Sequence, residues 1–541
     1  MSTNILSLMT FLPLIGAILI LFIPKQNHSI HRGVALATTL VTFLVSIPLV
    51  TGFQTNAEFQ FVEKMPWIAV GPFQMNYHLG IDGISLWLVI LTTFIMPIAV
   101  LSTWTAVEEH VKEYMICLLL LQVGMLGAFI ALDLFLFYIF WEVMLIPMYF
   151  IIGIWGGKNR IYAALKFFIY TMAGSVLMLV ALIFLYFKAG AGDFNLTHFY
   201  NLNLDPQTQT WLFLAFALSF AIKVPMFPLH TWLPDAHTEA PTAGSVILAA
   251  ILLKMGTYGY VRFAMPLFPD ATARFTPLIA TLSVIGIIYA ALVAMVQEDV
   301  KKLVAYSSVA HLGFVMLGVF ALTPQGVAGG MLQMLNHGVS TGALFLIVGF
   351  IYERRHTRMI VDFGGLAKQM PVFATIFMIV TFSSIGLPGT NGFVGEFLVL
   401  VGSYQSLKWY TVIATTGVIF AAVYMLWMFQ RVMFGQLTNP KNKELEDLNG
   451  RELAVILPLV VMIFVMGLYP KPFLDTMAPS IEKMIAVTKS KQITMTSAPA
   501  PTAPVTPQGG SAMPLPEGHG GGMTQMPADH PAMPSSAPSH Q

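Results

Sequence analysis

The chain has 541 residues, of which 56% are hydrophobic and only 10% are charged. An ordinary soluble domain has about 25% charged residues, so this composition excludes a water-soluble globular protein. A formal net charge of +1 gives no electrostatic basis for binding nucleic acid. The single cysteine, Cys117, cannot by itself form a disulfide, a CxxC metal site or an iron–sulfur cluster.

Long apolar segments recur along most of the chain. A membrane-spanning helix needs about 20 mostly apolar residues, and this criterion predicts about fourteen spans in an all-α polytopic membrane protein. The first span begins near Asn4 without a basic stretch before it, which favours a retained span over a removed signal peptide. Between the second and third spans, residues 52–80 carry short aromatic and β-branched runs with Pro and Gly, which predict a small hairpin on the membrane face. The predicted spans are centred near Ile15, Thr42, Phe94, Gly124, Ile146, Leu177, Ser219, Leu252, Ile285, Leu312, Leu344, Ile385, Ile419 and Val461.

Basic residues are distributed unevenly between the two sets of loops. The alternate loops that start after the first span hold fifteen lysines and arginines, Lys301 among them. The opposite loops hold five, which are Lys64, Lys188, Arg262, Arg274 and Lys408. Because basic loops stay inside, this ratio predicts an even number of spans with both termini outside.

Two stretches should interrupt membrane helices. The first, AIKVPMFPLHTWLPDAHTEAPTAGS (221–245), combines Lys223 with two prolines. The second, SSIGLPGTNGFVGEF (383–397), has a proline between glycines and ends near Glu396. Prolines break helical hydrogen bonds, and broken backbone is tolerated in lipid only where it is buried in protein or lines a wet cavity. Paired breaks indicate two five-helix repeats, inverted because five is odd, each with a discontinuous helix and typical of transporters.

These features divide the chain into five predicted segments. The three-helix N-terminal segment carries the outside-facing hairpin, two five-helix repeats follow, and a C-terminal helix with its flanks precedes a tail rich in Pro, Gly, Met and His. The tail cannot bury a core and is expected to be disordered. The segments are residues 1–110, 111–265, 266–435, 436–490 and 491–541.

Ionisable residues inside the apolar spans are the candidate functional residues. Acids, lysines and histidines in series near mid-membrane are what a proton relay requires. A glutamate that approaches a poorly hydrated lysine holds its proton, and moving away releases it, so such a pair can act as a switch. The candidates are Glu142, Lys223, Lys254, Glu396, His311, His337 and Lys166.

Structural roles remain open for several candidates. Lys166 could extend its ammonium to the membrane interface, and His311 or His337 could bridge helices in the core. Glu142 and Lys223 could form a static ion pair, although an apolar replacement of such a pair is often no less stable.

Several kinds of site lack a sequence signal. The chain has no GxGxxG after a strand and no GxxxxGK[ST], so no nucleotide site is expected, and no histidine pair forms an evident heme motif. The acids and histidines at positions 230–239 fit no trusted metal-ligand spacing. The tail residues His519, His530 and His540 could bind a soft metal, but a solvated extension is the favoured interpretation. The chain therefore needs a gradient or a partner to drive ion movement.

Five runs together resemble the antiporter-like subunits of respiratory complex I, the NADH:quinone oxidoreductase. The resemblance covers about residues 1–490 and is nearest to the bacterial M type, counterpart of mitochondrial NADH dehydrogenase subunit 4. The runs are GIDGIS (80–85), FYIFWEVMLIPMYFIIGIWGG (137–157), KVPMFPLHTWLPDAHTEAPTAGSVILAAILLKMGTYG (223–259), QEDVKKLVAYSSVAHLGF (297–314) and GLPGTNGFVGEF (386–397).

The resemblance implies a role for most candidates. Glu142 matches the fifth-helix glutamate, Lys223 the lysine of the broken seventh helix, and Lys254 the eighth-helix lysine of a central polar axis. His311 and His337 match residues that link the second half. Glu396 matches the twelfth-helix glutamate that the M type carries where the L and N types have lysine.

The resemblance also implies the setting of the chain. It implies a proton-translocating subunit of the bacterial inner membrane, with L-type and N-type subunits beside it, lipid around it and no cofactor of its own. FMN, iron–sulfur clusters and quinone would belong to partner subunits, so the chain would serve an enzyme without holding its redox site. A cation/proton antiporter subunit, a membrane-bound hydrogenase subunit and a non-transporting scaffold are the alternatives.

Overall fold

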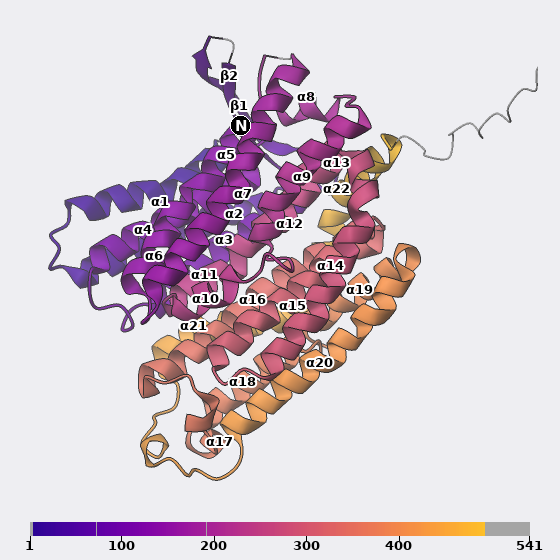
Figure 1. The fold of residues 1–541 in the computed structure, drawn as a ribbon. Helices are drawn as coiled ribbons and strands as arrows, with labels where there is room; N and C mark the ends of the chain where they lie inside the picture. Colours follow the sequence, from indigo (N-terminus) through magenta and orange to yellow (C-terminus); the bar gives the residue numbers. More distant parts are fainter. Residues whose placement is uncertain (1–3, 72, 191, 493–541) are drawn as a thin grey trace, which may run out of the picture. The chain divides into compact units, whose positions relative to one another are not determined.

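The computed structural model describes residues 4–71, 73–190 and 192–492 of the chain (Figure 1). Twelve helices within this part are long and apolar enough to cross a membrane, which confirms a mainly helical polytopic membrane protein. The total of about fourteen spans stays a prediction, and the expected disorder of the tail concerns residues almost wholly outside the described part. The twelve are α1 (Ile5–Phe22), α2 (His28–Thr51), α3 (Gly83–Ser102), α4 (Val111–Ile130), α5 with α6 (Leu134–Val143, Leu145–Trp155), α7 (Arg160–Ala189), α11 to α13 (Thr242–Ile247, Leu253–Gly259, Met265–Leu267, with η1 and η2 between), α14 (Pro269–Met295), α15 (Val300–Phe320), α16 (Pro324–Arg355), α20 (Lys408–Met433) and α21 (Gly450–Leu468).

Both predicted interruptions are present. The first separates α9 (Pro206–Lys223) from α10 (Trp232–Glu239), and the second separates α18 (Pro371–Ser384) from α19 (Asn391–Ser406). Protein groups satisfy carbonyls freed at the first break, since the Trp232 indole N–H donates to the Ile222 carbonyl at 2.9 Å. This is how a membrane protein tolerates non-helical backbone away from water. The inverted relation of the two five-helix repeats stays a prediction.

A β-hairpin forms where the sequence predicts one. Strands β1 (Gln60–Val70) and β2 (Phe73–Ile81) pair antiparallel, and Figure 1 shows them beyond the ends of the helices. In the C-terminal segment, a further helix, α22 (Lys471–Ser490), follows α21. Its Ser480 hydroxyl accepts a hydrogen bond from the Gly83 N–H at 3.1 Å, and Lys483 pairs with Glu58 at 2.8 Å. The remaining short elements are α8 (Leu196–Tyr200), η3 (Ile360–Asp362), α17 (Leu366–Gln369) and η4 (Pro440–Asn442).

A buried ion pair joins the start of α3 to the π-helical segment η2 (Tyr260–Ala264). The Asp82 carboxylate caps α3 by accepting from the N–H groups of Ile84 and Ser85. The Arg262 guanidinium donates to the same carboxylate at 2.8 and 2.5 Å. Burial opposes ionisation of Asp82, but the Arg262 charge together with the hydrogen bonds from Arg262, Ser85 and Ile84 lowers the pKa of the carboxyl below its usual value. The prediction that Arg262 lies in an outer loop is therefore wrong, because only 5% of its surface is exposed.

Substitution Arg262→Gln should destabilise this end of the molecule. The change leaves the Asp82 charge buried without its partner, which typically costs about 3–5 kcal/mol. Thermal denaturation of the purified complex that contains the chain measures the loss, and the exposed Arg274→Gln change serves as the matched control. Equal melting temperatures for the two variants would contradict a stabilising role for this pair.

Candidate functional site

Lys223 ends α9 in a buried position. Its side chain is 2% exposed, and its ammonium lies 4.9 Å from the centre of the Trp141 ring. Glu142, the next residue of α5, is half-buried, and its charge acts on Lys223. The two groups form no salt bridge within 4 Å among the described residues. The structure therefore places Glu142 and Lys223 in one charged group, held apart instead of paired, and adds Trp141 to it.

The helix that carries Lys254 packs tightly on the helix that ends at Lys223. A side chain at Gly256 would meet the Phe220 carbonyl oxygen at 2.6 Å, so only glycine allows this approach of α12 to α9. Two π-helical segments, η1 (Leu248–Leu252) and η2, flank α12. Such irregular turns occur frequently at functional sites. Lys254 itself is fully buried.

Four of the candidates form one contiguous series, which we call the buried row: Lys254, His337, His311 and Glu396. The Lys254 ammonium donates to the Ala249 carbonyl and to His337 Nδ1, the latter at 2.5 Å. The rings of His337 and His311 meet edge to face with centroids 6.0 Å apart. His311 Nδ1 lies 2.9 Å from the Glu396 carboxylate. Each member is at most 4% exposed, so the row is buried within the protein.

Neutral polar side chains around Glu396 were missed by the sequence reasoning. The Gln333 amide donates to Glu396 at 3.0 Å, and Asn336 donates to Gln333 at 3.0 Å. A cavity of about 10 Å³ lies against these amides and both row histidines. That volume is at the lower limit for one water molecule, about 10–15 Å³. No sequence signal marks such residues, because single amides are common in helices for many reasons.

Lys166 lies apart from the row. Its ammonium forms an ion pair with Asp235 at 2.7 Å, and its side chain is 19% exposed. The sequence allowed Lys166 either a place among the buried candidates or a position at the membrane interface. The structure favours a partly exposed position over a place in the row.

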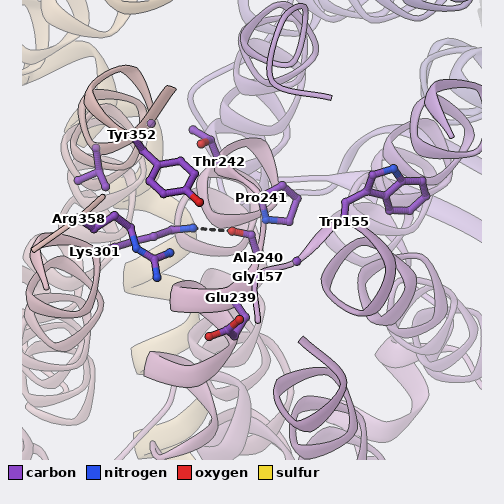
Figure 2. A pocket seen from close by; sticks show the side chains of 12 residues that line it. Trp155, Gly157, Glu239, Ala240, Pro241, Thr242, Lys301, Tyr352 and Arg358 are labelled. Carbon is purple, nitrogen blue, oxygen red and sulfur yellow. Dashed lines mark hydrogen bonds between the residues drawn. The ribbon is translucent and has the colours of Figure 1, made fainter. Parts of the chain in front are cut away.

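The C-terminal end of α10 is fastened by four different segments. Its last carbonyls would otherwise lack partners. The Ser245 hydroxyl donates a hydrogen bond to the His237 carbonyl, and the Arg358 guanidinium donates one to the Thr238 carbonyl. The Gly157 N–H donates to the Glu239 carbonyl. The Lys301 ammonium donates to the Ala240 carbonyl. Figure 2 shows the Lys301 contact, at 2.5 Å, inside a pocket at this end. The placement of Lys301 in a basic loop is wrong, because it lies in the first turn of α15 and is 5% exposed.

Among the described residues, no group of three or more His, Cys, Asp or Glu side chains is placed to hold a metal ion. The row instead offers donors and acceptors in series, which is an arrangement for passing a proton.

Comparison with known proteins identifies the family. Residues 131–425 match the family described as NADH:quinone oxidoreductase/Mrp antiporter, transmembrane. NADH-quinone oxidoreductase subunit M of Rhodobacter capsulatus is 51% identical over 498 residues, which cover 89% of this chain and 96% of that protein. NADH-ubiquinone oxidoreductase chain 4 of Marchantia polymorpha is 46% identical over 482 residues, 89% and 97% of the two chains.

A solved structure agrees with these matches. A chain of respiratory complex I from Thermus thermophilus with bound NADH superposes with a TM-score of 0.82 at 31% identity, covering 90% of this chain and 100% of that one. The chain therefore belongs to the NADH:quinone oxidoreductase/Mrp antiporter family of transmembrane proteins.

Substitution Gly395→Ala should disturb the surroundings of Glu396 from within its own helix. The added Cβ would meet Gln333 Oε1 at 2.3 Å and Asn336 Nδ2 at 2.6 Å, so both amides must move. Overpacking of this kind costs about 1–3 kcal/mol. Gly153→Ala is the control, because its Cβ meets nothing nearer than 3.5 Å. Thermal denaturation of the complex should separate the two variants, and identical curves would refute the tight packing at Gly395.

Proposed function

We propose that the chain is the M-type membrane-arm subunit of an NADH:quinone oxidoreductase and that it translocates protons along the buried row. The comparisons support the family and the type of subunit. The single observation that carries the proton path is the unbroken series from Lys254 through His337 and His311 to Glu396.

The row has the chemistry that proton transfer needs. Lys254 already donates to His337 Nδ1, so this hydrogen bond is the first transfer step. A histidine takes a proton at one nitrogen and gives one up at the other, which suits His337 and His311 to intermediate positions. Glu396 supplies the negative charge that attracts a proton moving along the row. The amides of Gln333 and Asn336 hold its carboxylate in place.

Glu142 and Lys223 regulate the row in this proposal. The neighbour of Lys223 is an aromatic ring, and no carboxylate of the described residues forms a salt bridge with Lys223. A small movement of Glu142 toward or away from Lys223 changes the stability of the ammonium strongly, because electrostatic interactions are weakly screened in a buried site. The tight contact of α12 with α9 at Gly256 then transmits the change toward Lys254.

The setting of the subunit follows from the same family. Quinone reduction in partner subunits supplies the energy, and FMN, iron–sulfur clusters and quinone belong to those partners. L-type and N-type subunits lie on either side in the bacterial inner membrane. The excess of basic residues in one set of loops supports a topology with both termini on the periplasmic side.

Two other functions remain distinguishable by experiment. A cation/proton antiporter or hydrogenase subunit would purify without NADH-oxidising partners. A scaffold would hold the membrane arm together without carrying protons, and the next two experiments separate it from a translocator.

Glu142→Gln should uncouple proton movement from electron transfer. The amide keeps the shape of the side chain but removes the charge that acts on Lys223. In inverted membrane vesicles, NADH oxidation should persist while protons moved per electron fall by this subunit's whole share, because the switch that controls the row no longer responds. Glu113→Gln, at an exposed ion pair with Lys25, is the control. If the subunit were only a scaffold, Glu142→Gln would impair assembly on native gels and leave the number of protons moved per electron unchanged.

Lys223→Ala should give the same loss as Glu142→Gln, because both changes disable one switch. The double variant should be no worse than either single variant, since residues that act as one unit are not additive. Proton-to-electron ratios measured in the same vesicles test this. A wild-type ratio for an assembled Lys223→Ala complex would contradict the proposed function.

A further inference from the structure

An open cavity at the basic end of the helices has no part in the mechanism described so far. Its volume is about 500 Å³, and it lies between the turn before α15, the loop that contains η3 and the last turn of α20. These segments belong to the loops rich in lysine and arginine, and hence to the predicted inner side of the membrane. Figure 1 shows α17, which follows η3, at the end of the molecule away from the β-hairpin. The residues that line the cavity are Glu298, Ile360, Val361, Phe363 and Arg431.

The Arg431 guanidinium has no hydrogen-bond acceptor in the described part of the chain. Arg431 lies in the last turn of α20, and its Nε and Nη2 atoms are buried without a partner. Its charge lies over the Trp427 ring, 4.2 Å from the ring centre, which positions the side chain without neutralising it. Buried donors on a charged group are costly to leave unpaired, so an anionic oxygen in the cavity would stabilise them.

A carboxylate in the same cavity is also without a partner. Glu298 is exposed, and its side chain makes no hydrogen bond or ion pair with any described residue. Its carbonyl accepts from the Ile360 N–H at 2.8 Å, which fixes this turn against η3. Arg431 and Glu298 line one cavity but form no salt bridge, so their charged atoms lie more than 4 Å apart. A ligand that carries a negative and a positive group can therefore contact both.

Apolar surface adjoins the two charges and continues along α20. The side chain of Val361 in the cavity is 85% exposed. Beyond Arg431, one face of α20 carries the exposed side chains of Trp427, Val423 and Ile419, each four residues from the next. The distance along the helix from Arg431 to Ile419 is about 18 Å. One leaflet of the hydrocarbon core is about 15 Å deep, so this face has the length of an acyl chain.

We propose that the cavity binds a phospholipid whose headgroup carries a phosphate and a primary ammonium, of the phosphatidylethanolamine type. The phosphate accepts hydrogen bonds from the Arg431 guanidinium, whose planar fork fits two phosphate oxygens. The ammonium donates to the Glu298 carboxylate, and the acyl chains lie along α20. Free phosphate has no apolar part to cover α20, and a lipid without the ammonium leaves Glu298 unpaired. The site is separate from the buried row and does not depend on the proposed proton path.

The test measures lipid contact in the whole complex, held in nanodiscs of phosphatidylglycerol. Two probes are compared, phosphatidylethanolamine and phosphatidylglycerol with the same photoreactive group in one acyl chain. Mass spectrometry of peptides gives the labelling of α20 relative to α1, which reports unspecific lipid contact. The phosphatidylethanolamine probe should label α20 more strongly, and unlabelled phosphatidylethanolamine should compete while inorganic phosphate should not. Arg431→Gln should reduce this labelling about tenfold or more, because the charged donor is lost.

The variant Glu298→Gln tests the recognition of the ammonium. It changes an exposed side chain, so assembly should be retained, and labelling by the phosphatidylethanolamine probe should fall to that of the other probe. Lys368→Gln is the matched control, because it removes one exposed basic charge on α17 outside the cavity, and both labels should stay unchanged.

Three results would overturn the lipid site. The first is equal labelling of α20 by the two probes in the wild-type complex. The second is labelling of Arg431→Gln that equals that of Lys368→Gln. The third is the absence of labelling on α20 in the wild-type complex, which would show that a neighbouring subunit covers the cavity. None of these results changes the proposed function of the row, which proton-to-electron ratios test separately.

Discussion

A charge in the middle of a membrane protein must find its partners within the protein, because hydrocarbon offers none. Lys254 shows this constraint most clearly. It is fully buried, and its partners in the described part of the chain are the Ala249 carbonyl and His337 Nδ1. Beyond His337, the ring contact with His311 and the hydrogen bond from His311 to Glu396 continue the series. The row is thus held together by the need of each buried polar group for a partner within the protein.

The irregular backbone of the protein serves the same requirement. The π-helical segments on either side of α12, the glycine at 256 and the two helix breaks all cost regular hydrogen bonding or side-chain packing. Each lies beside a buried ionisable residue. At the end of α10, four segments each supply one donor to a carbonyl, so the helix that follows the first break is fixed by protein contacts at its far end. Irregular helices here are therefore the means by which charges are placed inside the membrane.

Much of this arrangement could be predicted from the sequence, because prolines, charges and apolar runs in lipid carry strong energetic penalties. Those penalties marked both breaks and all members of the row. They could not show that His337 pairs with Lys254, since the two are far apart in the chain. The same reasoning from energetic penalties gave the wrong position for Arg262 and Lys301, because it assigned both residues to loops on the basis of their charge. Their burial depends on Asp82 and on the Ala240 carbonyl, which only the folded chain brings near.

The central claim is that the row is one path in series, and a double-variant measurement tests it most directly. Protons moved per electron should be compared for complexes with Lys254→Ala, Glu396→Gln and both changes, with NADH oxidation and assembly measured in each. A path in series predicts that each single change removes the same share and that the double variant loses no more. Losses that add together, or a single variant with the wild-type ratio, would contradict the account.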